Sequence, residues 1–188
     1  YQLLDHFFRV TYSGAYRAPH FSELFSDGVH HGTNRYEIGS QELNIEYANQ
    51  LDFKHQWSND HLGFIFNPFA QYISDFISIN PIDSIKDGYK VYEYVQYDKV
   101  EIKGLEMNIH YHPHQIHNLH FEQSYSFLQT ENLALVPANS IKTKILLSEN
   151  NMDKLLKYKI DYLSIYHVYK FEQDSYAKYE DLTEAYNV

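Results

Sequence analysis

Histidine and carboxylate side chains gather in one short stretch near the start of the chain. Residues 27–32 read Asp-Gly-Val-His-His-Gly, so that two adjacent histidines lie between glycines. Imidazole and carboxylate are donors that borderline metals such as Zn²⁺ favour. Adjacent side chains of a strand point to opposite faces, whereas a glycine-flanked loop allows them to converge. The spacing is not a consensus zinc motif, so a metal site and a set of solvated loop histidines both fit. The candidate ligands are His20, Asp27, His30, His31 and Glu37.

A second histidine-rich segment covers residues 110–120. His110 and His112 share a strand face by alternation, and His120 would approach them across a hairpin. Three converging imidazoles would make a secondary metal site, for transit or release of an ion. The preferred interpretation is simpler, because polar residues at a short turn also account for these histidines.

Composition narrows the classes of function. The chain has 25 acidic and 15 basic residues, a formal net charge of −10, which argues against nucleic acid and favours cationic ligands. It has no cysteine, so thiolate sites and cysteine nucleophiles are excluded. We find no catalytic triad order, phosphate-cradling glycine loop or paired carboxylates, and therefore expect no enzyme and no required cofactor. Bound zinc or haem would be cargo.

Alternation of apolar and polar residues dominates the sequence. The 19 Tyr and 12 Phe coexist with a mean hydropathy of −0.53, as expected where each apolar side chain is followed by a polar one. Tyrosine-rich runs suit the aromatic belt at a membrane interface. The pattern predicts seven strands, at residues 1–15, 43–57, 61–80, 93–111, 119–130, 141–147 and 156–169.

The strands are long, and the connections between them alternate in length. Loops are expected at residues 16–43 and 81–92, short turns at 58–60 and 113–118, and a bulge near Gly104. Strands of about 9–11 tilted residues cross a bilayer. The pattern predicts an all-β fold, an antiparallel transmembrane β-barrel fragment with long extracellular loops and short periplasmic turns. A soluble β-sandwich or propeller would also alternate.

Several motifs resemble those of the TonB-dependent outer-membrane receptors. Tyr16-Arg17-Ala18-Pro19 is similar to the family's aromatic-Arg-Ala-Pro box, and Phe21-Ser22-Glu23-Leu24 follows as an aromatic-x-Glu-Leu element. Gly39-Ser40-Gln41-Glu42-Leu43 stands where the family has Gly-Asn-Pro-x-Leu, although Ser40 and Gln41 depart from it. Further matches are Glu46, Asn67-Pro68-Phe69, Ile73-x-Asp75-Phe76-Ile77 and Lys103-Gly104-Leu105-Glu106.

This resemblance implies that residues 1–188 form part of a barrel of about 22 strands, without the plug domain and the remaining strands. It implies a bacterial outer-membrane location, outer-membrane lipid as surroundings, and a TonB-type inner-membrane protein as energy-coupling partner. The sequence around His30 and His31 resembles that of the zinc- or metal-uptake branch of the family. Metal import is therefore the leading hypothesis. Haem receptors place an axial histidine in the same interval, so haem or ferric-siderophore uptake is an alternative. A soluble or surface β-rich binding or adhesion protein is the alternative of another class.

Overall fold

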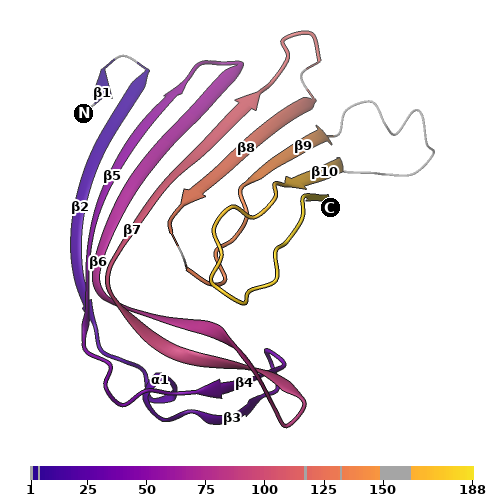
Figure 1. Ribbon diagram of the computed structural model, residues 1–188. Helices are drawn as coiled ribbons and strands as arrows, with labels where there is room; N and C mark the ends of the chain where they lie inside the picture. Colours follow the sequence, from indigo (N-terminus) through magenta and orange to yellow (C-terminus); the bar gives the residue numbers. More distant parts are fainter. Residues whose placement is uncertain (1, 4, 117, 132, 149–161) are drawn as a thin grey trace.

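The computed structural model describes residues 2–3, 5–116, 118–131, 133–148 and 162–188, and its architecture is one curved sheet (Figure 1). Seven long strands pair antiparallel in chain order, which confirms the predicted all-β barrel-type fold. The last predicted strand begins at Tyr162, and residues 156–161 lie outside the described part of the chain. The seven are β2 (His6–Arg17), β5 (Glu46–Ser58), β6 (Leu62–Lys86), β7 (Tyr89–Tyr111), β8 (Leu119–Gln129), β9 (Ser140–Ser148) and β10 (Tyr162–Lys170).

Five short elements complete the described structure. β1 (Gln2–Leu3) and β11 (Tyr186–Asn187) pair with β2 and β10. The connection from β2 to β5 contains α1 (Phe21–Phe25), β3 (Asp27–His30) and β4 (Arg35–Ile38). Part of the predicted loop is therefore an ordered hairpin.

Among the described residues, no helix has the length and apolar character needed to cross a bilayer.

The two faces of the sheet differ sharply in chemistry. Paired residues of neighbouring strands lie on the same face, so the register defines rows across the sheet. One row is largely apolar and aromatic: His55, Phe66, Met107, Tyr125, Ile141 and Tyr169. The adjacent row is polar: Asn67, Glu106, Ser126, Ser140 and Lys170. An apolar face toward lipid and a polar interior are what a membrane barrel requires.

The turn from β5 to β6 and the connection from β7 to β8 lie at one end of the sheet, whereas the connection with α1, β3 and β4 and the extended tip of the β6–β7 hairpin lie at the other (Figure 1). The predicted turn at residues 58–60 is confirmed: Asn59 Oδ1 accepts hydrogen bonds from the amides of His61 and Leu62, at 2.9 and 2.8 Å. In membrane barrels the short turns are periplasmic and the longer loops extracellular. The connection holding α1, β3 and β4 therefore lies on the extracellular side.

The predicted loop at residues 81–92 is wrong, because β6 and β7 continue through it as one long hairpin. Pro81 pairs with Tyr92 and Lys86 with Tyr89, across a register shift between Pro81 and Ile85. The hairpin closes at Asp87 and Gly88, both with positive φ (55° and 82°), the backbone that a tight hairpin turn needs. The Asp-Gly pair was the signal for this turn in the sequence.

The predicted bulge near Gly104 is also wrong. Gly104 pairs in register with Phe69, and a Cβ on Gly104 would lie 2.3 Å from the Phe69 ring. The apparent phase slip arises because Val100 faces the barrel interior, where it is buried opposite Ile73. The apolar residues of β7 change sides while the strand stays regular.

Candidate ligand-binding site

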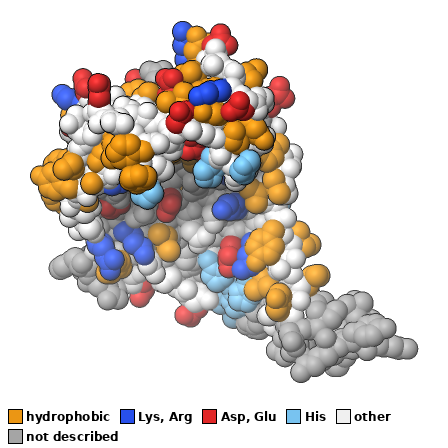
Figure 2. Space-filling model, turned by 90° about the horizontal axis from the view of Figure 1, so that it is seen from below, with side chains coloured by type: hydrophobic (Ala, Val, Ile, Leu, Met, Phe, Trp, Pro, Cys, Tyr) orange, Lys and Arg blue, Asp and Glu red, His pale blue; other side chains and the backbone are white. Residues whose placement is uncertain are grey.

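The candidate site lies in the β3–β4 hairpin, which is attached to the barrel wall (Figure 1). β3 pairs antiparallel with β4, and β4 pairs in parallel with β7, with Tyr36 opposite Val91 and Ile38 opposite Glu93. Val91 is 1% exposed beneath this contact. The hairpin is thus an extension of the main sheet. Viewed from below, acidic and basic side chains lie among hydrophobic ones around a hollow (Figure 2).

Strand pairing sorts the predicted ligands onto two faces of the hairpin. His30 is opposite Arg35 and Gly28 opposite Glu37, so His30 and Glu37 share a face. Asp27 is opposite Ile38 and lies on the other face. The structure therefore brings two of the five predicted donors to one side of the hairpin.

His30 and His31 mark the point where β3 ends. His30 Nδ1 lies 2.9 Å from Thr33 Oγ1, a contact across the turn. His31 is exposed in that turn, which passes through Asn34 with φ of 54°. Both imidazoles are consequently close to solvent at the tip of the hairpin, where an incoming ligand can reach them.

Glu37 is 5% exposed and has several partners. Its Oε1 accepts a hydrogen bond from Arg35 Nε at 2.7 Å, and its Oε2 accepts one from the Tyr94 hydroxyl at 3.2 Å. Burial alone would raise the pKa of Glu37, but the Arg35 hydrogen bond and charge, followed by Tyr94 and His30, hold that pKa below its ordinary value of 4.5. Glu37 is therefore an anion at the hairpin throughout the physiological range.

We expect the hairpin to loosen in acid through Glu37. A carboxyl with a depressed folded-state pKa adds stability above its ordinary value of 4.5, and loses it as pH falls through the lower folded-state value. A spin label on Glu42→Cys, in the exposed segment after β4, should keep the same mobility from about pH 7 to 5 and gain mobility below about 4.5. Glu37→Gln should remove the gain in mobility that begins near pH 4.5, whereas Asp27, whose pKa is also lowered, contributes only in stronger acid. An identical acid transition in Glu37→Gln would contradict the assignment.

Asp27 joins the hairpin to the tip of β6. Its Oδ1 accepts hydrogen bonds from the Tyr36 hydroxyl at 2.6 Å and from Lys86 Nζ at 3.1 Å. The Tyr36 hydrogen bond, then Lys86, lowers the pKa of Asp27. Lys86 Nζ also lies 4.2 Å from the centre of the Tyr36 ring. These contacts give Asp27 a positioning role.

His20 caps the short helix α1. Its imidazole Nδ1 accepts a hydrogen bond from the Ser22 amide at 3.3 Å, while its own amide donates to Glu23 Oε2 at 2.6 Å. This reciprocal arrangement is a capping box, with histidine in the place usually taken by Ser or Thr. His20 therefore fixes the start of α1.

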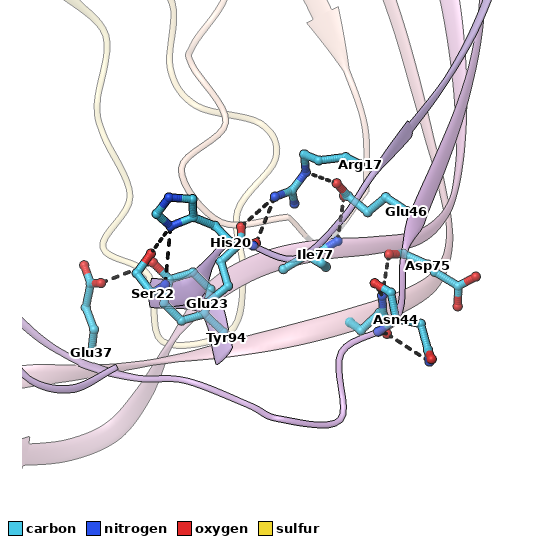
Figure 3. Close-up of polar contacts among 11 residues, drawn as sticks. Arg17, His20, Ser22, Glu23, Glu37, Asn44, Glu46, Asp75, Ile77 and Tyr94 are labelled. Carbon is cyan, nitrogen blue, oxygen red and sulfur yellow. Dashed lines mark hydrogen bonds and ion pairs between the residues drawn. The ribbon is translucent and has the colours of Figure 1, made fainter. Parts of the chain in front are cut away.

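A carboxylate and guanidinium network ties the connection to the barrel wall (Figure 3). Arg17, at the end of β2, pairs through Nη1 with both Glu23 oxygens at 2.9 and 2.8 Å, and through Nε with Glu46. Glu46, 6% exposed, also accepts the Ile77 amide at 2.8 Å. The sequence singled out Arg17, Glu23 and Glu46 only as motif residues, and the structure assigns them this joint role.

Gln96, on β7, makes a second attachment. Its side chain accepts from the Asn44 amide at 2.8 Å and donates to the carbonyls of Asn44 and Asp75, at 3.0 and 2.7 Å. Asp75 has φ of 55°. Sequence reasoning missed Gln96, because its partners are backbone atoms of two distant segments.

Almost the whole chain is similar to one protein family. Residues 1–180 match the family described as TonB dependent receptor-like, beta-barrel. The chain belongs to this family of TonB-dependent receptors. These receptors are outer-membrane β-barrel proteins of Gram-negative bacteria, which overturns the soluble alternative. They are transport proteins.

Solved TonB-dependent receptors share the fold. The chain matches the copper transporter OprC with a TM-score of 0.75 and 16% identity, covering 97% of this chain and 28% of that one. It matches the ferric enterobactin receptor PfeA of Pseudomonas aeruginosa, in a G324V mutant, with 0.65 and 14%, covering 98% and 30%. For the FrpB iron transporter of Neisseria meningitidis the values are 0.62, 14%, 98% and 29%. The chain thus spans less than a third of each receptor. No curated protein matches the chain.

The second histidine cluster lies at the short-turn end of this receptor chain. His110 Nε2 is 3.3 Å from His120 Nδ1, and the His112 and His120 rings stack with centres 4.9 Å apart. The structure thus places the three predicted histidines side by side. Within the described ranges, no group of three or more His, Cys, Asp or Glu side chains is arranged to hold a metal ion. Metal binding at either histidine cluster stays a prediction.

Proposed function

We propose that the chain is part of an outer-membrane receptor that captures a metal ion, zinc or a similar borderline metal, for import. The observation that carries the proposal is the anchored β3–β4 hairpin, which holds His30 and the anionic Glu37 on one face, with His31 at its tip. Neutral imidazole and carboxylate are the donors such ions select, and the chain has no cysteine to supply thiolate. Small rotations of exposed side chains would complete a ligand set around an arriving ion.

The structural neighbours support a metal as cargo. OprC is named as a copper transporter, PfeA as a ferric enterobactin receptor and FrpB as an iron transporter. At 14 to 16% identity these proteins share the fold, so the choice of metal rests on this chain's own donors. Twelve histidines and a net charge of −10 favour a cation over an anionic complex.

Family membership supports the source of energy. A TonB-type protein of the inner membrane would couple import to energy, through a plug domain in the complete receptor. The barrel wall contributed by this chain would hold the extracellular hairpin above the polar interior. Uptake would then proceed from His30 and His31 at the outer side toward the periplasmic turns, where His110, His112 and His120 lie.

Calorimetry with zinc on the complete receptor tests the proposal. His30→Ala with His31→Ala should weaken zinc binding at least about tenfold, since each lost imidazole removes one coordinate bond. His167→Ala is the control, because His167 is exposed on β10 and contacts Asn187 at 3.0 Å. It should leave the affinity unchanged.

Three outcomes would change the proposal. Unchanged zinc affinity in the double variant would overturn it. Haem absorbance that depends on His30 or His31, without zinc binding, would replace zinc by haem, for which one axial histidine and an apolar slot suffice. Binding of a ferric siderophore alone would point to the third cargo class.

A further inference from the structure

Five histidines form a continuous row at the periplasmic end of the sheet. His61 lies between His114 and His112, with ring centres 4.6 and 6.0 Å away. His120 lies between His112 and His110, with ring centres 4.9 and 5.5 Å away. The row draws on the turn before β6, the end of β7 with the connection that follows it, and the start of β8. The structure thus adds His61 and His114 to the three histidines that the sequence had grouped.

The strand-borne part of this row faces the interior of the barrel. His110 pairs with Glu122 on β8 and lies four residues after Glu106, which belongs to the polar row of the sheet. His120 lies two residues before Glu122 and therefore shares its face. Residues that anchor a barrel at the lipid interface, such as Tyr111 next to His110, point the other way. An interface role therefore does not account for His110 and His120.

His110 and His120 are spaced as two ligands of one metal ion. His110 Nε2 is 3.3 Å from His120 Nδ1, and the two ring planes differ by only 6°. Two imidazole nitrogens bound tetrahedrally to Zn²⁺ at about 2.0–2.1 Å lie about 3.4 Å from each other. In the present contact one nitrogen carries a hydrogen and the other accepts it. A bound ion would take the place of that hydrogen with little movement of either ring.

The surroundings of this pair favour an open, readily exchanged site. Glu122, opposite His110, places a carboxylate beside the pair, and its Oε2 is also 3.5 Å from Lys144 Nζ. Within the described ranges, no group of three or more donors is arranged to close a ligand set. An ion on His110 and His120 would therefore keep water in its other positions. Such a site holds an ion less firmly than a closed structural site, and the neighbouring His112 offers the next donor.

We propose that His110 and His120 form a two-histidine site for a borderline divalent metal ion, on the inner face of the barrel wall at its periplasmic end. The row continues from this pair through His112 and His61 to His114, which is exposed. An ion leaving the pair would meet one imidazole after another on its way to the periplasm. This exit role rests on the proposed function, whereas metal binding by the pair does not.

Zinc calorimetry on the complete receptor carrying His30→Ala and His31→Ala isolates the site, because these substitutions remove the histidines of the extracellular hairpin. This background should still bind zinc. Adding His110→Gln with His120→Gln should weaken that binding at least about tenfold, since two coordinate bonds are lost. Glutamine keeps a polar side chain on the interior face. The result does not depend on whether His30 and His31 bind zinc, so the two proposals fail separately.

A second histidine pair supplies the matched control. His6 Nδ1 lies 3.0 Å from His55 Nε2, but His55 belongs to the apolar row and its ring stacks on Phe8 with centres 4.4 Å apart. Lipid or detergent chains would cover this pair and keep a hydrated ion away. His6→Gln with His55→Gln should therefore leave the zinc affinity of the background unchanged.

Copper gives a reading that does not depend on the folding of a variant. Nitrogen donors bind Cu²⁺ more tightly than Zn²⁺, and electron paramagnetic resonance of Cu²⁺ added to the background should show two imidazole nitrogens. Copper held by oxygen donors alone would overturn the proposal. So would a background that binds no zinc, an affinity unaffected by the His110 and His120 substitutions, or an equal loss in the control variant.

Discussion

Glu46→Ala should loosen the extracellular connection that carries the β3–β4 hairpin. Glu46 is buried, pairs with Arg17 and accepts the Ile77 amide, so its loss leaves the buried amide without an acceptor and takes one of the two carboxylates from Arg17, which keeps only Glu23. We expect a local cost of about 2 kcal/mol, which corresponds to roughly 30-fold more frequent opening. Arg35 is the single lysine or arginine between residues 18 and 45, so trypsin reports this opening by one cut. The rate of that cut in the complete receptor is the measurement.

Two variants make this experiment specific. Glu46→Gln keeps an acceptor for the Ile77 amide and loses the charge facing Arg17, so its cleavage rate should be intermediate. Glu42→Ala changes an exposed carboxylate of the same connection and should be cut as slowly as the unmodified protein. If Glu46→Ala were cut no faster than Glu42→Ala, the network would not be what holds the hairpin.

Gly39→Ala should loosen the packing of α1 against the end of β4. A Cβ on Gly39 would lie 2.7 to 2.8 Å from backbone atoms of Leu24, Phe25 and Ser26, and backbone cannot move aside as a side-chain tip can. The Gly39 amide donates to the Ser26 carbonyl at 2.7 Å, and that hydrogen bond would be strained or lost. We expect a cost of about 1–3 kcal/mol, as for overpacking of a tight contact.

Hydrogen exchange measured by mass spectrometry over residues 21–40 checks this expectation. The amides of Gly39 and Ser40, which bond to the carbonyls of Ser26 and Glu23, should exchange roughly tenfold faster or more in Gly39→Ala. Gly28→Ala is the matched control, because a Cβ there meets nothing within 4 Å. Equal protection in the two variants would show that the close approach at Gly39 is relieved at little cost.

The long strands were predictable because alternation over a dozen residues is set by the lipid and the polar interior together. The turn at Asn59 was predictable for a similar local reason, since its side chain bonds to nearby amides. The strand structure of residues 81–92 was not predictable, because Pro81 and several polar residues resemble a loop, and only the structure shows that β4 pairs with β7 there. The alternation pattern also gave the wrong prediction of a bulge near Gly104. Only the close packing of the Phe69 ring shows why this position carries glycine.

The residue types of the candidate site are read from the sequence, whereas their arrangement is known only from the structure. The spacing of His30 and Glu37 shows that both lie in one connection, but only the register of β3 with β4 puts them on one face and Asp27 on the other. His20, a predicted ligand, is the N-cap of α1 in the structure, and the only sequence signal for that role is Glu23 three residues later. Gln96 could not be found, since nothing in a sequence marks a side chain that bonds distant backbone.

The parallel pairing of β4 with β7 has a consequence for how this surface can be altered. The hairpin is held along its strands and by Asp27, while the four residues from His31 to Asn34 extend beyond that support as an exposed turn. Substitutions or short insertions in the turn can therefore change its chemistry without disturbing the frame that carries it. The same geometry makes residues 31–34 a natural place to graft a foreign peptide for display on the cell surface.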